Sequence, residues 1–250
     1  MALRIAQISD IHCGDIRFDS ATLGEFISEI NKYNPDVVIV AGDLTAAGYR
    51  NEFEEVKKHI DTIECKKKII VAGNHDCRNV GYEHFEKIFG PRHSEMIIPK
   101  GKIKGLSRSV RIKAVDSNRP DSDDGEVGRD KYKYIDKFFK GKEGYSILVL
   151  HHHLVSIPKT GRERNVVYDA GDLLSKISDL KIDMVLSGHK HVPYVWELNG
   201  VKLVSSGTSG TGRVRGSVPP AINFIEISDK KIKISIHYSN GKRDNFDLKK

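Results

Sequence analysis

The strongest constraint on the fold is a series of short β-branched runs separated by stretches with helical periodicity. The runs are LRIAQIS (3–9), DVVIVAG (36–42), KKIIVAG (67–73), VRIKAVDS (110–117), YSILVLH (145–151) and DMVLSGH (183–189). The stretch 20–33 begins with a Ser cap and repeats apolar residues at helical spacing, at Leu23, Phe26, Ile27 and Ile30. Residues 50–64, 81–89, 129–140 and 169–180 show the same pattern. Alternation of this kind indicates an α/β fold.

The pattern changes after residue 190, where short strands follow one another directly. Tight turns such as Asn199-Gly200 and Asp229-Lys230 join them, which predicts an antiparallel meander or a set of hairpins. No linker rich in Pro, Gly or Ser separates the two parts of the chain. We therefore expect residues 1–250 to form a single domain.

Composition narrows the class of protein. A chain of 250 residues with 38% hydrophobic content can bury a large core. Its net charge of +7 weakly favours anionic partners but falls short of the dense basic stripe of a nucleic-acid-binding protein. Three cysteines (Cys13, Cys65 and Cys77) are too few for a disulfide framework, which favours a reducing compartment, the cytoplasm. We find neither a signal peptide nor an apolar run long enough to span a membrane.

Histidines gather where the predicted strands end. Of the 11 histidines, those in tight groups are His12, His75, the triplet His151-His152-His153, and His189 with His191. Each group directly follows a predicted strand. Ligands of open α/β sheets bind beyond the carboxyl ends of the strands, so these side chains should converge.

Carboxylates, an amide and glycines accompany the histidines. The groups are Asp10-Ile11-His12, Gly42-Asp43, Gly73-Asn74-His75-Asp76, His151 and Gly188-His189-Lys190-His191. Side chains two residues apart at an extended strand end point to one face and can share a metal. Imidazole together with carboxylate suits Zn, Mn, Fe or Co. The glycines permit a sharp turn and a close approach of the backbone.

Two other segments invite a metal-site interpretation that the sequence does not support. In the histidine triplet, an extended strand would point His151 and His153 to one face and His152 to the other, so binding of one metal by all three is not expected. The acidic loop 117–128 fails the EF-hand spacing, and we expect a solvated loop there.

Taken together, the five groups resemble the motif set of the calcineurin-like metallophosphoesterase superfamily, from Asp10 to His191. The stretches NPDVVIVAGDLTAAG and AGNHDCRNVGYEHFEKIFG are similar to the branch that contains the class III cyclic-nucleotide phosphodiesterases. The resemblance implies a four-layer α/β/β/α sandwich, in which two mixed sheets are flanked by helices. It also implies that the strands after residue 190 complete the second sheet.

The resemblance further implies a centre with two divalent or trivalent metal ions. Seven residues would hold them: Asp10, His12 and His191 on one ion, Asn74, His151 and His189 on the other, and Asp43 bridging both. Mn or Fe is favoured over Zn or Co. Two divalent ions and two carboxylates leave a charge near +2, which attracts phosphate and lowers the pKa of a bound water towards ~7.

By the same resemblance, His75 stabilises the transition state and protonates the leaving oxygen, while Asp76 orients the ring and raises its pKa. A cap on the following helix is an alternative role for Asp76, and the two roles are compatible. The chain departs from the family pattern at His153, where Pro is common; the first histidine of the triplet is the expected ligand.

Substrate-binding residues are expected among basic side chains near these motifs, because arginine forks match phosphate oxygens. The candidates are Arg78, His152, Arg162, Arg164 and Arg213, with Arg215 beside the last. Each arginine is explained equally well as a solvated loop residue. Cys13 and Cys77 follow metal motifs, and we interpret both as small neighbours of the site.

The resulting hypothesis is an enzyme that hydrolyses a small phosphodiester, such as a cyclic nucleotide, with a metal-activated hydroxide. A phosphomonoesterase and a nuclease stay open as alternatives, although repair nucleases of the superfamily usually add capping domains for which this chain has no room. A non-catalytic scaffold is a further alternative, and the intact ligand set counts against it. The expected partner is a small phosphorylated substrate rather than nucleic acid or a membrane.

Overall fold

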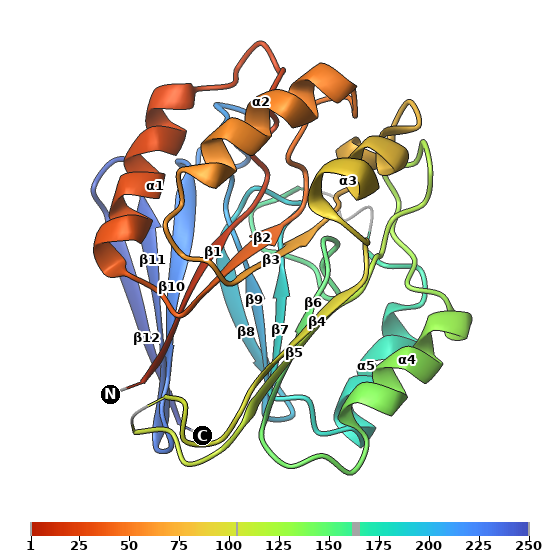
Figure 1. Cartoon of the computed structure of the whole chain (residues 1–250), viewed down its shortest axis with the longest axis vertical. Coiled ribbons are helices and arrows are strands. Elements are labelled where there is room, and N and C mark those ends of the chain that lie inside the picture. The colour runs from red at the N-terminus through yellow and green to blue at the C-terminus, as the bar shows by residue number, and fades with distance from the viewer. Residues whose placement is uncertain (1, 104, 162–165, 250) are drawn as a thin grey trace.

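Two sheets stacked face to face form the centre of the molecule, and helices cover their outer faces (Figure 1). This computed structural model describes residues 2–103, 105–161 and 166–249. The first sheet has the order β12-β11-β10-β1-β2-β3, and the second has the order β4-β5-β6-β7-β9-β8.

The bounds of the elements are as follows. The first sheet contains β1 (Leu3–Ile8), β2 (Val37–Ala41), β3 (Lys68–Val71), β10 (Ala221–Ile227), β11 (Lys231–Tyr238) and β12 (Arg243–Lys249). The second contains β4 (Ser94–Ile98), β5 (Val110–Ala114), β6 (Tyr145–Val149), β7 (Met184–Ser187), β8 (Tyr194–Leu198) and β9 (Val201–Ser205). The helices are α1 (Ser20–Tyr33), α2 (Arg50–Asp61), α3 (Gly81–Phe89), α4 (Arg129–Phe139) and α5 (Ala170–Asp179), together with the 3-10 turn η1 (His75–Cys77).

The layers follow from strands that are apolar on both faces. In β2, Val37 and Ile39 pack into the apolar layer between the two sheets, while Val38 and Val40 face the core beneath α1 and α2. In β6, Leu148 packs on the opposite outer face, in the core that α4 and α5 cover. Strands buried on both faces give continuous rather than alternating apolar runs. The predicted four-layer α/β/β/α sandwich is confirmed (Figure 1).

The direction of the strands positions the candidate site. β1, β2 and β3 are parallel neighbours in one sheet, and β5, β6 and β7 are parallel neighbours in the other. All the predicted ligand groups follow the carboxyl ends of β1, β2, β3, β6 and β7. Both sheets therefore deliver side chains to one edge of the sandwich.

The strands after residue 190 do not all complete the second sheet, so that expectation is wrong in part. The hairpin β8-β9, turned at Asn199 and Gly200 with φ of 50° and 81°, joins β7 in the second sheet. By contrast, β10, β11 and β12 extend the first sheet, where β10 pairs antiparallel with β1. The pairing partner of a strand this far along the chain is set by tertiary packing, which local turn residues do not encode.

Local predictions differ from the structure at a few positions. The cap of α1 is Asp19 rather than Ser20, because the Asp19 carboxylate accepts hydrogen bonds from the backbone N–H groups of Ala21 and Thr22. Sequence patterns did not predict β4 and β12. Both are edge strands in which exposed and half-buried side chains predominate among those described, so their apolar signal is weak. Among the described residues, no helix has the length and apolarity needed to cross a bilayer.

Ile39 offers a test of the layer between the sheets, because its side chain is fully buried there. We expect Ile39→Ala to lower the free energy of unfolding by about 2–5 kcal/mol, through lost burial and the cavity left behind. Urea unfolding, monitored by circular dichroism, measures this change in the free energy of unfolding. Ile16→Ala, the same substitution at a side chain that is 98% exposed, is the control and should change stability by no more than about 0.5 kcal/mol. Equal effects in the two variants would contradict the assignment of this core.

Candidate active site

Seven side chains predicted as metal ligands meet at the carboxyl edge of the two sheets. Asp10 and His12 follow β1, Asp43 follows β2, and Asn74 follows β3 in the first sheet. The second sheet supplies the other members of the set, His151 after β6 and His189 and His191 after β7. All seven are buried. Residues separated by up to 181 positions (191 − 10) thus share one buried polar cluster.

One half of the cluster joins Asp10, His12 and His191. The Nε2 atoms of His12 and His191 lie 3.0 Å apart, and the Nε2 of His191 lies 3.4 Å from an oxygen of Asp10. The Nε2 of His12 also lies 3.6 Å from Oδ2 of Asp43. These spacings bring three potential ligand atoms close enough to share one cation.

The other half joins Asn74, His151 and His189 to the same Asp43 oxygen. The Oδ1 of Asn74 lies 3.1 Å from Nε2 of His151 and 3.0 Å from Nδ1 of His189. Asp43 Oδ2 lies 3.4 Å from Nε2 of His151. Asp43 therefore contacts both halves, the position expected of a bridging ligand.

The protonation of the imidazoles shows that electron donors converge here. His151 Nδ1 lies 2.7 Å from the carbonyl oxygen of Ala41, and His191 Nδ1 contacts the carbonyl oxygen of Arg213. A carbonyl oxygen only accepts hydrogen bonds, so each Nδ1 carries a proton and each Nε2 is the ring nitrogen that faces the cluster. Imidazole nitrogens and carboxylates that face one another are stabilised by a positive charge between them, and this donor set fits transition-metal ions.

The negative charge of the buried carboxylates also favours a cation in the cluster. Burial lowers the pKa of His151, but the carboxylates of Asp43 and Asp10 outweigh burial and raise it to about 9. A proton on His151 thus takes the place that a metal ion would fill. Burial holds the pKa values of His12 and His189 well below the ordinary range, so these rings are neutral and able to bind metal.

The backbone is strained where it presents these ligands. Asp10, His12, Asp43, His189 and His191 all have positive φ, between 52° and 75°. Residues other than glycine in this left-handed region cost about 1–3 kcal/mol each, and they cluster at functional sites. The turn directly after each strand aims the side chain into the seam between the sheets.

Glycines before the ligands permit the close approach that the sequence predicts. A Cβ on Gly73 would lie 2.2 Å from the Asp43 carboxylate, and one on Gly188 would lie 1.9 Å from the Ser9 hydroxyl oxygen. Gly42 has a φ of +92°, and a Cβ there would lie 2.5 Å from the His151 ring. No larger residue fits these three positions without displacing a ligand.

His75 lies beside the cluster, but Asp76 does not orient it, which corrects that expectation. The Nδ1 of His75 contacts the carbonyl oxygen of Ala46, so that carbonyl sets the ring orientation. The Asp76 carboxylate instead accepts from the backbone N–H groups of Leu44, Thr45 and Gly73 and from the Thr45 hydroxyl. Asp76 thereby fixes the loops that carry Asp43 and Asn74. His75 also lies within 4.8 Å of ligand atoms of His12 and Asp43, in a third group able to hold a cation.

Two of the predicted arginines lie at the rim of the site. Arg78 Nη1 lies 3.0 Å from Nδ1 of His75, and Arg213 Nη1 lies 3.4 Å from Nε2 of the same ring. Arg162 and Arg164 lie outside the described residues.

His152 and His153 lie behind the ligands. Both ring nitrogens of His152 are engaged, Nδ1 with the Ser117 hydroxyl at 2.9 Å and Nε2 with the carbonyl oxygen of Asp123 at 3.3 Å. Because this ring is fully buried, these contacts argue against a substrate-binding role for His152. His153 stacks on His189, with ring centroids 5.6 Å apart.

Sequence patterns missed two carboxylates at the rim. Asp123, in the loop expected to be merely solvated, accepts a hydrogen bond from Asn74 and pairs with Arg78. Asp15 lies 3.9 Å from Arg213. Neither belongs to a motif at a strand end, so no spacing pattern identifies them.

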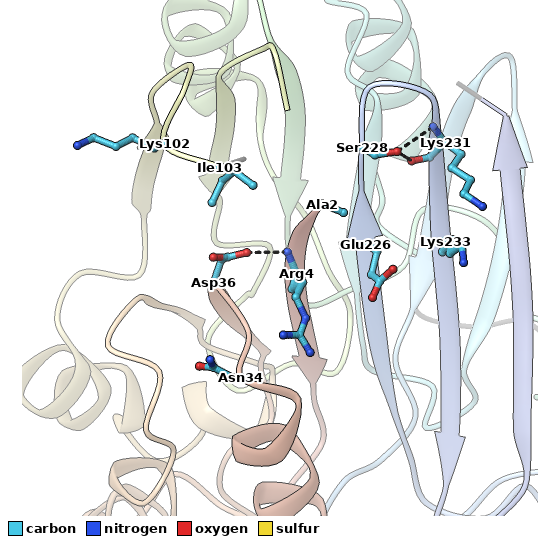
Figure 2. Close-up of a pocket in the computed structure, with 10 residues that line it drawn as sticks. All are labelled: Ala2, Arg4, Asn34, Asp36, Lys102, Ile103, Glu226, Ser228, Lys231 and Lys233. Carbon is cyan, nitrogen blue, oxygen red and sulfur yellow. Dashed lines mark hydrogen bonds between the residues drawn. The ribbon is translucent and has the colours of Figure 1, made fainter. Parts of the chain in front are cut away.

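The cavity shown in Figure 2 is separate from this site. It has a volume of about 600 Å³ and lies near the amino ends of β1 and β2 and the turn between β10 and β11. Side chains of both charges line it, among them Arg4, Asp36 and Glu226. None of the candidate ligands contributes to it, and it is at the opposite edge from the clustered histidines.

Two facing sheets bring buried imidazole and carboxylate donors together at their carboxyl edge, an arrangement able to bind metal ions. A sequence model of the calcineurin-like phosphoesterase family matches residues 3–193, and the chain belongs to this family. A probable cyclic nucleotide phosphodiesterase of Synechococcus is 28% identical over 207 residues, which are 78% of this chain and 76% of that protein.

Solved structures support the fold. A dimetal phosphatase from Danio rerio superposes with a TM-score of 0.72 at 10% identity, covering 100% of this chain and 99% of that one. An anchor protein of the Plasmodium inner membrane complex has a TM-score of 0.73 at 16% identity, with coverage of 99% and 89%. At these identities the likeness concerns the fold alone.

Cysteine reactivity tests the packing around the ligand loops. Cys13 and Cys77 are buried, and burial raises the pKa of both thiols, that of Cys13 to about 12. Cys65 is only partly buried. We expect Ellman's reagent at pH 8 to react rapidly with one thiol in the native protein and with three after denaturation, because thiolates are the reactive form. Rapid reaction of more than one native thiol would contradict this packing.

Proposed function

We propose that this chain hydrolyses small phosphodiesters at a centre that binds two metal ions. The observation that carries the proposal is the Asp43 carboxylate, whose Oδ2 lies 3.6 Å from His12 in one half of the cluster and 3.4 Å from His151 in the other. The ligand sets are those expected from the sequence: Asp10, His12 and His191 for one ion, and Asn74, His151 and His189 for the other. Bound there, Mn or Fe ions would supply Lewis-acid charge and an activated water at neutral pH.

The protein's own residues supply the proton and position the phosphate. Because the Ala46 carbonyl accepts from Nδ1 of His75, Nε2 is the ring nitrogen left to exchange a proton with a substrate, and it lies on the side of Arg213. His75 is therefore placed to protonate a leaving oxygen held at the rim. Asp76 acts through structure, since its hydrogen bonds fix the loops that carry Asp43 and Asn74.

The charges at the rim favour a diester over a monoester. Arg78 pairs with Asp123, and Arg213 lies 3.9 Å from Asp15, so carboxylates partly neutralise both candidate phosphate-binding arginines. A diester carries one negative charge, whereas a monoester approaches two at pH 7. A rim with little net positive charge suits the singly charged substrate. Relatives named as probable cyclic nucleotide phosphodiesterases support the same substrate class.

Turnover of a generic diester tests the proposal. We expect purified protein with added Mn²⁺ to hydrolyse bis-p-nitrophenyl phosphate faster than p-nitrophenyl phosphate, because of the charge balance at the rim. Chelation should abolish both activities and Mn²⁺ should restore them; released nitrophenolate is the measurement. No turnover of either ester with Mn, Fe, Co or Zn would refute the enzyme mechanism. A panel of cyclic nucleotides, dinucleotides, glycerophosphodiesters and short nucleic acids then identifies the substrate class.

The role of His75 is tested separately from metal binding. His75→Ala should reduce kcat by about 10²–10⁴-fold, the usual contribution of a general acid, while the metal content stays that of the wild type. His84→Ala, which removes a histidine of α3 that belongs to none of the three groups able to hold a cation, is the control. Metal analysis alongside the kinetics distinguishes lost chemistry from lost metal. If His75→Ala lost metal in proportion to activity, His75 would be a ligand rather than the proton donor.

A further inference from the structure

The loop 117–128 contacts one half of the ligand cluster through Asp123. Oδ1 of Asp123 lies 3.0 Å from Nδ2 of Asn74 and also pairs with Nη2 of Arg78. Asn74 belongs to the half of the cluster that contains His151 and His189. One carboxylate oxygen therefore joins a candidate metal ligand to a candidate phosphate-binding arginine.

Hydrogen bonds on both sides of Asp123 hold this loop in place. The Asp121 carboxylate accepts from the backbone N–H of Asn79 at 3.0 Å. The carbonyl oxygen of Asp123 accepts from the buried His152 ring, and the Asp124 carboxylate accepts from the Tyr168 hydroxyl at 2.6 Å. The backbone of Asp123 is thus fixed although 59% of its side-chain surface is exposed.

Each hydrogen bond of the His152 ring pairs one donor with one acceptor. The carbonyl oxygen of Asp123 only accepts hydrogen bonds, so the Nε2 of His152 that faces it carries a proton. Its Nε2–H donates to the Asp123 carbonyl, and its Nδ1 accepts from the Ser117 hydroxyl, whose oxygen in turn accepts from the His152 backbone N–H. The His152 ring thereby holds the loop at two residues, Ser117 and Asp123.

The chemistry of a carboxylate decides which way the Asn74 amide faces. An ionised carboxylate only accepts hydrogen bonds, so the NH₂ group of Asn74 must point to Asp123. The amide oxygen then faces the imidazole nitrogens of His151 and His189, at 3.1 and 3.0 Å. With the amide turned over, two N–H donors would occupy the position where a cation needs an oxygen ligand.

We propose that Asp123 is a positioning residue that holds the Asn74 amide with its oxygen directed to the second metal ion. This inference rests on the proposed two-metal centre. Groups that orient a ligand from behind typically change metal affinity by 10–100-fold when they are removed. Asp123 itself does not reach the reacting atoms; it acts through Asn74.

Two substitutions separate the acceptor oxygen from the negative charge. Asp123→Ala removes both, and we expect the weaker of two Mn²⁺ dissociation constants to rise about 10–100-fold, as measured by calorimetry on the full chain. Asp123→Asn keeps an acceptor oxygen, so its Mn²⁺ affinity should stay within about threefold of the wild type. Glu126→Ala is the matched control, because it removes a carboxylate of the same loop that contacts Arg119 rather than a ligand.

Each outcome decides for or against the inference. If Asp123→Ala bound both Mn²⁺ ions with wild-type affinity, the inference would be wrong. Equal losses of Mn²⁺ affinity in Asp123→Ala and Asp123→Asn would also overturn it, because the charge of Asp123 rather than the orientation of Asn74 would then be responsible. An equal loss in Glu126→Ala would assign the effect to the loop as a whole and also overturn it. Metal binding is measured without turnover, so this test does not depend on activity. A wild-type protein that binds two ions but is inactive would refute the proposed reaction, and the inference about Asp123 would still stand or fall on the affinities.

Discussion

The structure depends on an arrangement that is unfavourable in the absence of a cation. Two carboxylates, an amide oxygen and four imidazoles are buried together, and the hydrogen bonds from the outer nitrogens of His151 and His191 direct the Nε2 atoms of these rings inward. Buried charges of this kind are stable only when they are paired or coordinate a metal. The apolar layers on either side supply the stability that permits such a cluster, and the two sheets meet in the orientation that assembles it.

Backbone geometry shows how the fold serves the cluster. Five of the ligand residues adopt left-handed backbone conformations, and glycines stand where a side chain would displace Asp43, His151 or Ser9. Asp76 ties the ends of β2 and β3 together through four hydrogen bonds. The backbone at the ligands is strained, and the hydrogen bonds directly behind the ligands are satisfied. These hydrogen bonds hold the strained backbone in place.

Most of the fold and the ligand set could be predicted because both have strong local signals. Runs such as VVIVA of β2 are apolar on both faces, and each ligand group directly follows such a run. The sheet to which β10 belongs has no local signal, because pairing with β1 joins residues more than 200 positions apart. The partners of Asp76 could not be predicted for a similar reason. Proximity to His75 in the sequence suggested a contact, but the 3-10 turn η1 directs the carboxylate towards backbone amides of another loop.

Asp123 shows a different limit. Its loop is polar, acidic and partly exposed, which is the composition of an ordinary solvated loop. What places Asp123 at the site is a set of contacts with Asn74, Arg78 and His152, and none of these is near it in the sequence. Residues that support a site from outside its motifs are recognised only through three-dimensional contacts.

The order of the ligands along the chain has a consequence for biosynthesis. Asp10 precedes the other six ligand candidates in the chain, whereas His189 and His191 follow β7, and β10, which follows still later, pairs with β1 on the edge opposite to β2. At about 5–20 residues per second, the interval between Asp10 and His191 is on the order of 10–40 s of translation. During this interval neither half of the cluster is complete. A metal ion held by the proposed ligands would therefore bind late, when the two sheets come together, rather than during folding of the amino-terminal strands.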